Sequence, residues 1–272
     1  MEPYTLPIVL TIAGNDPTGG AGLSADVEAI LSQGCHALPV VSCVTVQDTC
    51  DVLAVETLHP DLLVQQARAV LEDLPVDAIK IGLLSSEENI EAVHEILADY
   101  GDIPVVLDPI ISAGGGTLLC DESAIDAMRE LLFPYVTLLT PNTEEARLLV
   151  PGCDNAQSAI SSLLEMGCEW VLLTGTHDNT REVINRLYSD KGEHQEFSWP
   201  RLEHSYHGSG CTLSSAIAGL LAQGLDMVDA VTQAQDYTWR SLQNGYRLGM
   251  GQLHPNRLFW AEESDTENDE EE

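Results

Sequence analysis

Short apolar runs recur along this chain, and the segments between them carry apolar residues at helical spacing. The runs are rich in Val, Ile and Leu and are only a few residues long. They cover residues 6–13, 38–45, 77–84, 103–108, 135–140 and 169–174. Their hydrophobicity is continuous rather than alternating, which is typical of strands buried on both faces. The pattern therefore predicts an α/β fold, with a mainly parallel central sheet between two layers of helices.

The segment 184–206 departs from this pattern. It opens with INRLYSDKGEHQEFSW, which is typical of two strands joined by a turn around Asp190, Lys191 and Gly192. We expect a small hairpin at the edge of the sheet. The chain has 272 residues, 44% hydrophobic content and no internal repeat, so we expect a single domain over residues 1–260.

The charge balance is strongly acidic, with 44 Asp and Glu against 11 Lys and Arg and a net charge of −33. A field of this sign repels nucleic acid and anionic lipid, so we expect neither as a partner. Residues 261–272 hold eight acids and predict a disordered, solvated tail. The rest of the chain is acidic as well, which fits either a halophilic host with a salty cytoplasm or a plain need for solubility.

The apolar runs and the cysteines both indicate a cytoplasmic location. Gly, Pro or charged residues interrupt the apolar stretches before they reach the length of a membrane span, and the first residues lack the features of a signal peptide. The seven cysteines are scattered and form no CxxC pair. Reduced thiols are the better interpretation.

A first glycine cluster, AGNDPTGGAG at 13–22, follows the first predicted strand and precedes a helix that should end near Gly34. Its glycines allow the backbone to approach a ligand closely. The spacing matches neither the dinucleotide fingerprint nor the P-loop. By itself the cluster is equally consistent with a tight connecting turn and with a ligand-binding loop.

A second cluster, HGSGCTLSSAIAGLLAQG at 207–224, is more informative. Gly208, Ser209 and Gly210 precede a helix with an apolar face, and the backbone N–H groups at such a helix start favour an anion. A phosphoryl group in transfer could bind there. Cys211 lies in the first turn, where we expect a lowered thiol pKa and a role in accepting a proton or holding a hydroxyl. The alternative for Cys211 is a small packing residue.

Polar residues follow two further predicted strands. Asp108 ends the run 103–108 and precedes the flexible SAGGG of 112–116, while Asn142 and Glu145 lie on one side of a helical first turn. These are the residue types that bind Mg²⁺ during phosphoryl transfer. The alternatives are an N-cap for Asn142 and an ordinary first-turn acid for Glu145.

The histidines supply no metal site, because no cysteine or acid cluster completes the spacing of His204 and His207. We interpret both as loop residues. His177 follows the run 169–174 and could approach a nucleotide, but an exposed turn is the simpler interpretation.

Taken in order, the loops of this chain resemble those of the hydroxymethylpyrimidine/phosphomethylpyrimidine kinases. The resemblance runs from about Leu6 to Trp260, and its most specific part is TPNTEEA followed about seventy residues later by HGSGCTLSSAIA. The matching segments are AGNDPTGGAG, SCVTVQDT, IKIGLL, VVLDP, LLTPNTEEA, LLTGTH and HGSGCTLSSAIA. The resemblance implies a ribokinase-like three-layer sandwich that uses ATP and Mg²⁺ to phosphorylate the thiamin pyrimidine and then its monophosphate.

The resemblance also implies roles for individual residues. The catalytic group would be Cys211, in the position of the wider superfamily's catalytic Asp, with Gly208, Ser209 and Gly210 as the anion hole. Asp108 and Glu145 would bind the metal. The residues expected to bind ATP are Asn142, Thr174 and Gly175. The residues expected around the pyrimidine are Ala21, Asp26, Gln47, Leu83 and Ile110, with Gln47 hydrogen-bonded to the ring edge.

Three lysines usual in that family are absent here. The loop after Asp108 has SAGGG in place of an AKSG-like sequence, Thr174 stands where a lysine precedes the next turn, and the helix at 227–244 carries Arg240 as its only base. The loss removes charge that neutralises phosphate, and a high cation concentration would partly replace it. Three alternatives stay open: a pyridoxal kinase, a pyrimidine-binding regulatory module without activity, and a flavodoxin-like nucleotide binder. A homodimer is an expectation from the family.

Overall fold

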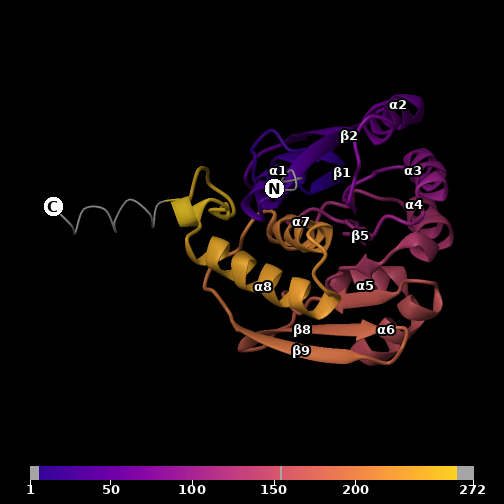
Figure 1. Ribbon diagram of the computed structural model, residues 1–272. Helices are drawn as coiled ribbons and strands as arrows, with labels where there is room; N and C mark the ends of the chain where they lie inside the picture. The colour runs from indigo at the N-terminus through magenta and orange to yellow at the C-terminus, as the bar shows by residue number, and fades with distance from the viewer. Residues whose placement is uncertain (1–5, 154, 262–272) are drawn as a thin grey trace, which may run out of the picture.

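The computed structural model describes residues 6–153 and 155–261, and its centre is one nine-stranded sheet (Figure 1). The strand order is β3-β2-β1-β4-β5-β6-β7-β8-β9. Pairing is parallel from β2 to β7, while β3 at one edge and β8 and β9 at the other run antiparallel to their neighbours. The strands are β1 (Ile8–Asn15), β2 (His36–Gln47), β3 (Val52–Thr57), β4 (Ala78–Ile81), β5 (Val105–Leu107), β6 (Leu138–Leu139), β7 (Trp170–Leu173), β8 (Glu182–Ser189) and β9 (His194–Pro200).

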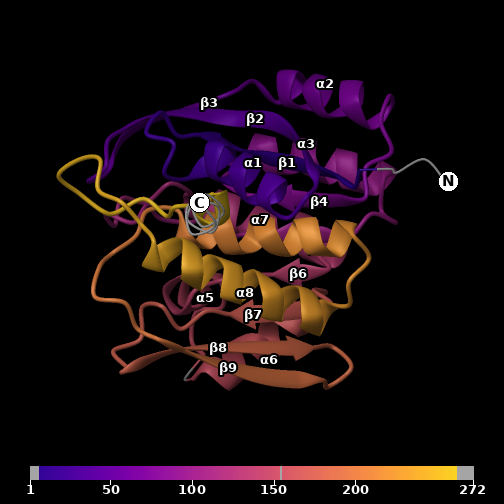
Figure 2. The ribbon, with the colours of Figure 1, turned by 60° about the vertical axis from the view of Figure 1, so that its left-hand side comes forward.

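Helices cover both faces of this sheet. Figure 2 shows α1 (Gly22–Ser32), α7 (Ser209–Ala222) and α8 (Met227–Gln243) on one side of it. The other face carries α2 (Pro60–Leu71), α3 (Glu87–Asp99), α4 (Glu122–Ala127), α5 (Thr143–Leu149) and α6 (Ala156–Glu165), with the short turns η1 (Met128–Leu132) and η2 (Phe133–Tyr135). The three-layer α/β prediction is confirmed.

The core explains why the strand sequences are apolar throughout. Successive residues of β1 point to opposite faces, so that Leu10 joins the cluster under α2 and α3 while Val9 joins the cluster under α1 and α7. In β4, Ile79 and Ala78 divide in the same way. Both faces of each strand are therefore buried. An alternating pattern would have placed polar side chains against one of the two helical layers.

The edges of the sheet were only partly predicted. The hairpin at 184–206 is confirmed as β8 and β9, which are joined by a turn in which the Gly192 N–H donates to the Ser189 carbonyl. A second hairpin, β2 with β3, was missed. The predicted tail lies outside the described residues except for Ala261, and the domain division at residue 260 stays a prediction. Within the described ranges, no helix combines the length and apolarity that crossing a bilayer requires.

Candidate active site

A cavity of about 720 Å³ lies at the carboxyl ends of the parallel strands, where the loops after β1, β5, β6 and β7 meet the start of α7. Its size falls in the range of small-molecule sites, roughly 300–1,000 Å³. Crevices at this end are the usual ligand sites of open α/β sheets. Most of the predicted site residues line it: Ala21, Gln47, Leu83, Asp108, Ile110, Asn142, Glu145, Thr174, Gly208, Ser209, Gly210 and Cys211. The two glycine clusters and the 142–145 turn therefore share one cavity.

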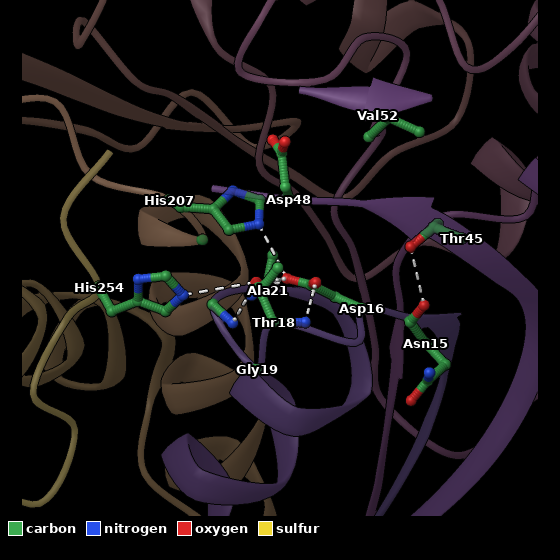
Figure 3. A network of polar contacts seen from close by, with 12 residues as sticks. Asn15, Asp16, Thr18, Gly19, Ala21, Thr45, Asp48, Val52, His207 and His254 are labelled. Atoms are coloured by element: carbon green, nitrogen blue, oxygen red, sulfur yellow. Dashed lines mark hydrogen bonds and ion pairs between the residues drawn. The ribbon is translucent and has the colours of Figure 1, made fainter. Parts of the chain in front are cut away.

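The first glycine cluster is organised by Asp16, an aspartate that was not among the predicted site residues (Figure 3). The Asp16 carboxylate accepts hydrogen bonds from the N–H groups of Thr18 and Ala21, each at 2.8 Å, and from His207 Nε2, also at 2.8 Å. Burial alone would raise its pKa, but these donors outweigh that effect and lower it to about 2. Asp16 is therefore ionised at neutral pH.

His207 lies in the turn before α7, in agreement with its interpretation as a loop residue, and its ring has a partner that the sequence did not indicate. Its bond to Asp16 joins segments 191 residues apart in sequence. No local pattern marks such a pairing. Two local features bear on this pairing: the Asp-Pro sequence after Asn15 and the His before Gly208. They become informative only once both loops are known to face one cavity.

The second glycine cluster forms the start of α7, which begins at Ser209, two residues earlier than predicted. Gly208 is the N-cap with φ of 79°, and a Cβ there would lie 2.0 Å from the Gly20 carbonyl oxygen. Glycine is needed for both reasons. No side chain of the described chain caps this helix. Its first-turn N–H groups are thus available to an anion at the cavity wall.

Cys211 lies in that first turn but does not have the low pKa that its position suggested. Burial raises the pKa of the thiol to about 12, and the lowering influence of Lys80 and of the Gly22 N–H does not compensate. The prediction of an activated thiolate is wrong. Cys211 is 5% exposed. At neutral pH it is a neutral thiol that can orient a hydroxyl by hydrogen bonding.

Asn142 and Glu145 form a capping box at the start of α5. The Asn142 side chain accepts from the Glu145 N–H at 2.9 Å, and Glu145 Oε2 accepts from the Asn142 N–H at 2.9 Å. The structural alternatives considered for both residues are therefore present, and both side chains still line the cavity. Oε2 of Glu145 holds the cap, and the backbone N–H of Ile111 also stabilises this carboxylate.

Two buried carboxyl groups lie at the centre of the cavity and influence each other. Burial, and then the charge of Asp108, raises the pKa of Glu145 to about 8. Burial raises the pKa of Asp108 to about 6 in spite of the charge of Lys80. Ser214 Oγ donates to Asp108 Oδ2 at 3.3 Å. A divalent cation would favour the ionised forms of both, and one or two carboxylates with waters are what Mg²⁺ prefers. No larger His, Cys, Asp and Glu cluster suited to a metal occurs in the described ranges.

Two predicted site residues do not reach the cavity. Asp26 is fully buried and accepts hydrogen bonds from Lys80 Nζ at 2.8 Å and from Thr11 and Ser215 at 2.7 Å. Its burial gives no support to the predicted contact with substrate. The sequence could not show that α1 turns this side chain toward the sheet. Gly175 is the second such residue, since its neighbours Thr174 and Thr176 line the cavity but Gly175 does not. Its N–H donates to Asn185 Oδ1 at 3.0 Å.

No lysine lines the cavity within the described ranges. Of the two lysines in the chain, Lys80 is paired to Asp26, and Lys191 lies in the turn between β8 and β9. Arg201 lines the cavity beside the loop that follows β7. Its guanidinium donates to three carbonyls of that loop, at Thr176 (2.7 Å), Asp178 (2.8 Å) and Thr180 (2.8 Å). The cavity consequently offers an anion few free positive charges.

A three-layer sandwich with an uncapped helix start and two buried carboxyl groups in one cavity is the arrangement expected of ribokinase-like phosphotransferases. The sequence model of a family described as phosphomethylpyrimidine kinase matches residues 16–256, and the chain belongs to this family. It is 37% identical to the hydroxymethylpyrimidine/phosphomethylpyrimidine kinase of Streptomyces coelicolor, over 95% of this chain and 97% of that protein. The resemblance stated from sequence is confirmed.

Solved structures agree with this assignment. The phosphomethylpyrimidine kinase of Clostridium difficile superimposes with a TM-score of 0.75 at 32% identity, covering 85% of this chain and 97% of that one. A pyridoxal kinase of Bacillus subtilis has a TM-score of 0.85 at 23% identity, covering 93% and 98%, and shares the fold. The flavodoxin-like alternative is excluded by the family match.

Proposed function

We propose that this protein transfers the γ-phosphoryl group of ATP to the hydroxymethyl group of 4-amino-5-hydroxymethyl-2-methylpyrimidine, and then phosphorylates the resulting monophosphate, in thiamin biosynthesis. The observation that carries the proposal is the shared cavity. The uncapped first turn of α7 and the Asn142–Glu145 turn open into the same 720 Å³ space. Family membership supplies the substrate class, since curated relatives at 37% and 36% identity carry the names of both phosphorylation steps.

The pyrimidine end of the cavity is formed by Ala21, Gln47, Leu83 and Ile110, which all line it. Leu83 is 7% exposed and offers an apolar wall, whereas the Gln47 amide offers one donor group and one acceptor. An amide of this kind can hydrogen-bond an aminopyrimidine edge in bidentate fashion. These residues would orient the ring so that its hydroxymethyl group faces α7.

The phosphoryl end is formed by the first turn of α7. The N–H groups of Ser209, Gly210 and Cys211 would stabilise the negative charge that spreads over the transferring group. Because Cys211 is a neutral thiol, it would orient the substrate hydroxyl rather than remove its proton. Asp108 Oδ2 would lie 3.5 Å from a Cβ on Gly210, so this carboxyl group is next to the same turn.

Asp108 and Glu145 would hold Mg²⁺, which neutralises phosphate charge when it is bound. Thr174 lies beside Asn142 through a parallel bridge and would face the nucleotide. We further propose a cytoplasmic enzyme that acts as a homodimer. The location rests on the sequence and the dimer on the family, and light scattering behind size exclusion tests the dimer.

The decisive experiment measures ADP formation with the pyrimidine alcohol, its monophosphate and pyridoxal as separate substrates. We expect higher kcat/KM for the pyrimidine alcohol than for pyridoxal. Cys211→Ala should lower kcat by roughly 10²-fold, as expected for loss of a group that contacts the reacting hydroxyl, while calorimetry shows that the ring still binds. Ring binding by the wild-type protein without ADP formation would contradict the kinase and support a regulatory module.

Faster turnover of pyridoxal would support the vitamin B6 alternative instead. That alternative has one structural observation in its favour. A pyridoxal kinase of Staphylococcus aureus in complex with pyridoxal superimposes with a TM-score of 0.84 at 24% identity, covering 93% of this chain and 94% of that one. A likeness at this identity concerns the fold, so the comparison of substrates in one assay decides.

A further inference from the structure

Three charged or ionisable side chains join the first glycine loop to the start of α7, and none of them has a role in the proposed reaction so far. They are Asp16, His207 and Arg257, which we call the loop clamp. The loop they hold is 16–22, which contributes Ala21 to the pyrimidine end. The element they attach it to is the helix start that would bind the phosphoryl group.

Asp16 and His207 form the first half of the clamp. Asp16 binds two N–H groups of its own loop and the ring of His207, which directly precedes Gly208. His254 packs edge-on against His207 at 6.0 Å between ring centroids, and its Nε2 contacts Thr18 Oγ1 at 3.4 Å (Figure 3). A Cβ on Gly20 would lie 2.3 Å from the His207 ring, so the two segments are in close contact.

Arg257 forms the second half and approaches from the opposite side of the loop. It is 2% exposed, and its guanidinium donates to the carbonyl oxygens of Gly19, at 3.4 Å, and Gly20. Its Nε donates to Thr212 Oγ1 at 2.9 Å, and that hydroxyl donates to the Gly208 carbonyl at 2.8 Å. One side chain therefore binds the backbone of the first glycine cluster directly and that of the second through the Thr212 hydroxyl.

The orientation of the peptide groups follows from these contacts. Peptide units are planar, so a carbonyl that faces Arg257 directs the following N–H to the other side. The carbonyl of Gly20 faces Arg257, and the N–H of Ala21 faces Asp16. Loss of either half would free the loop to rotate, because glycine resists rotation less than any other residue.

We infer that Asp16, His207 and Arg257 are positioning residues for phosphoryl transfer, which set the distance between the bound hydroxymethyl group and the anion-binding turn of α7. The inference rests on the proposed function and deepens it. None of the three needs to touch the reacting atoms. Displacement of a reacting group by about 1 Å can lower a rate by roughly 10²-fold. The clamp therefore acts on kcat more than on the affinity for either substrate alone.

The test removes each half of the clamp, as His207→Leu and Arg257→Met, and restores a donor to Asp16 with His207→Gln. Matched controls are His94→Leu and Arg129→Met, half-buried residues on α3 and η1 that also bind a backbone carbonyl, of Leu131 and Leu149. We expect kcat to fall by roughly 10²-fold in both clamp variants, with the KM for ATP changed little, and to recover substantially in His207→Gln. Melting temperatures should fall further in the clamp variants than in the controls, because buried partners lose their donors, so kcat is measured well below every melting temperature.

Hydrogen exchange of the backbone amides at 18–22 gives a second measurement that needs no turnover. Exchange should accelerate in His207→Leu and Arg257→Met and stay near the wild-type rate in His207→Gln. Unchanged exchange, or a kcat that stays as high as in the controls, would overturn the clamp. A wild-type protein that forms no ADP would overturn the proposed function, and accelerated exchange in the variants would then still establish that these residues hold the loop.

Discussion

The two ends of the cavity are stabilised in different ways. At the proposed pyrimidine end, the buried charges of Asp16 and Arg257 bind backbone groups of the first glycine loop. At the proposed nucleotide end, Arg201 donates to carbonyls of the loop after β7, and no lysine of the described residues lines the cavity. The comparison teaches that buried charges hold the proposed substrate loop, whereas the proposed nucleotide end has few free positive charges and, on our proposal, relies on backbone N–H groups and on cations from solution.

The largest expected effect comes from Gly208, where the two glycine loops meet. In Gly208→Ala the new Cβ would lie 2.0 Å from the Gly20 oxygen, and the positive φ adds about 1–2 kcal/mol of strain. We expect kcat to fall by at least roughly 10²-fold because the loops must separate. The measurement is steady-state ADP formation, together with the free energy of unfolding in urea.

Gly224 supplies the control for that variant. Its φ is 84°, but a Cβ there would meet no atom within 4 Å. Gly224→Ala should lose about 1 kcal/mol of stability from the same strain while keeping its turnover. Equal losses of kcat in both variants would show that strain, and not contact between the loops, limits the enzyme.

The next effect concerns the charge of Asp16. Its pKa is lowered from 3.8 to about 2 in the folded protein, so its ionised form stabilises the fold above pH 3.8, and that contribution is lost as the pH falls toward 2. Asp16→Asn should therefore lose about 2 kcal/mol of stability at pH 7. Urea unfolding of both proteins at a series of pH values should show the difference shrinking below pH 4.

Asp48 gives the matched control, because it is an exposed aspartate that accepts N–H groups of the neighbouring turn at Cys50 and Asp51. Asp48→Asn should change stability less than Asp16→Asn does. A stability difference for Asp16→Asn that does not vary with pH would mean that the charge is not its cause.

A smaller effect is expected at the nucleotide end. Arg201→Met removes hydrogen bonds to the carbonyls of Thr176, Asp178 and Thr180, each contributing roughly 0.5–1.5 kcal/mol. The loop after β7 should become mobile, and the KM for ATP should rise by about tenfold, with the KM for the pyrimidine alcohol unchanged. The control is Arg186→Met, in the hairpin of β8 and β9. Among the contacts described, the Arg186 side chain pairs only with Glu196. A rise in both KM values would contradict the assignment of Arg201 to the nucleotide end alone.

The smallest effect restores a cation. Thr174→Lys places an ammonium beside Asn142 and should lower the KM for ATP by roughly threefold at low ionic strength, with less effect as KCl rises. For the wild-type protein we expect the KM for ATP to fall as KCl rises, because solvent cations partly replace the missing lysines. Gln195→Lys, on β9 away from the cavity, controls for net charge. A KM that does not depend on KCl would refute the hypothesis of replacement by salt.

The fold could be predicted where burial on both sides demanded a continuous apolar sequence. Leu10 and Val9 belong to different core clusters, and no other pattern serves both faces of β1. The edge strand β3 was missed because its sequence is short and carries no periodic pattern. Val52 is buried, whereas Leu53, which is equally apolar, is 73% exposed. Edge strands carry the weakest constraints on sequence, since one side has no partner strand.

The candidate site could be predicted from glycine spacing and polar residues at strand ends, but its electrostatics could not. The helix start should lower the pKa of Cys211, yet burial, which a local pattern does not reveal, raises it to about 12. The bond between Asp16 and His207 escaped for the same reason, because it exists only after the chain has brought two distant loops together.

The contact of Arg257 with Gly19 and Gly20 joins residues more than 230 positions apart. On the ribosome, the loop at 16–22 is made early but cannot take its final shape until residue 257 has emerged and folded back. During synthesis this glycine loop must stay without its clamp while most of the sheet assembles. The enzyme would therefore become competent only after nearly all of its chain has been translated.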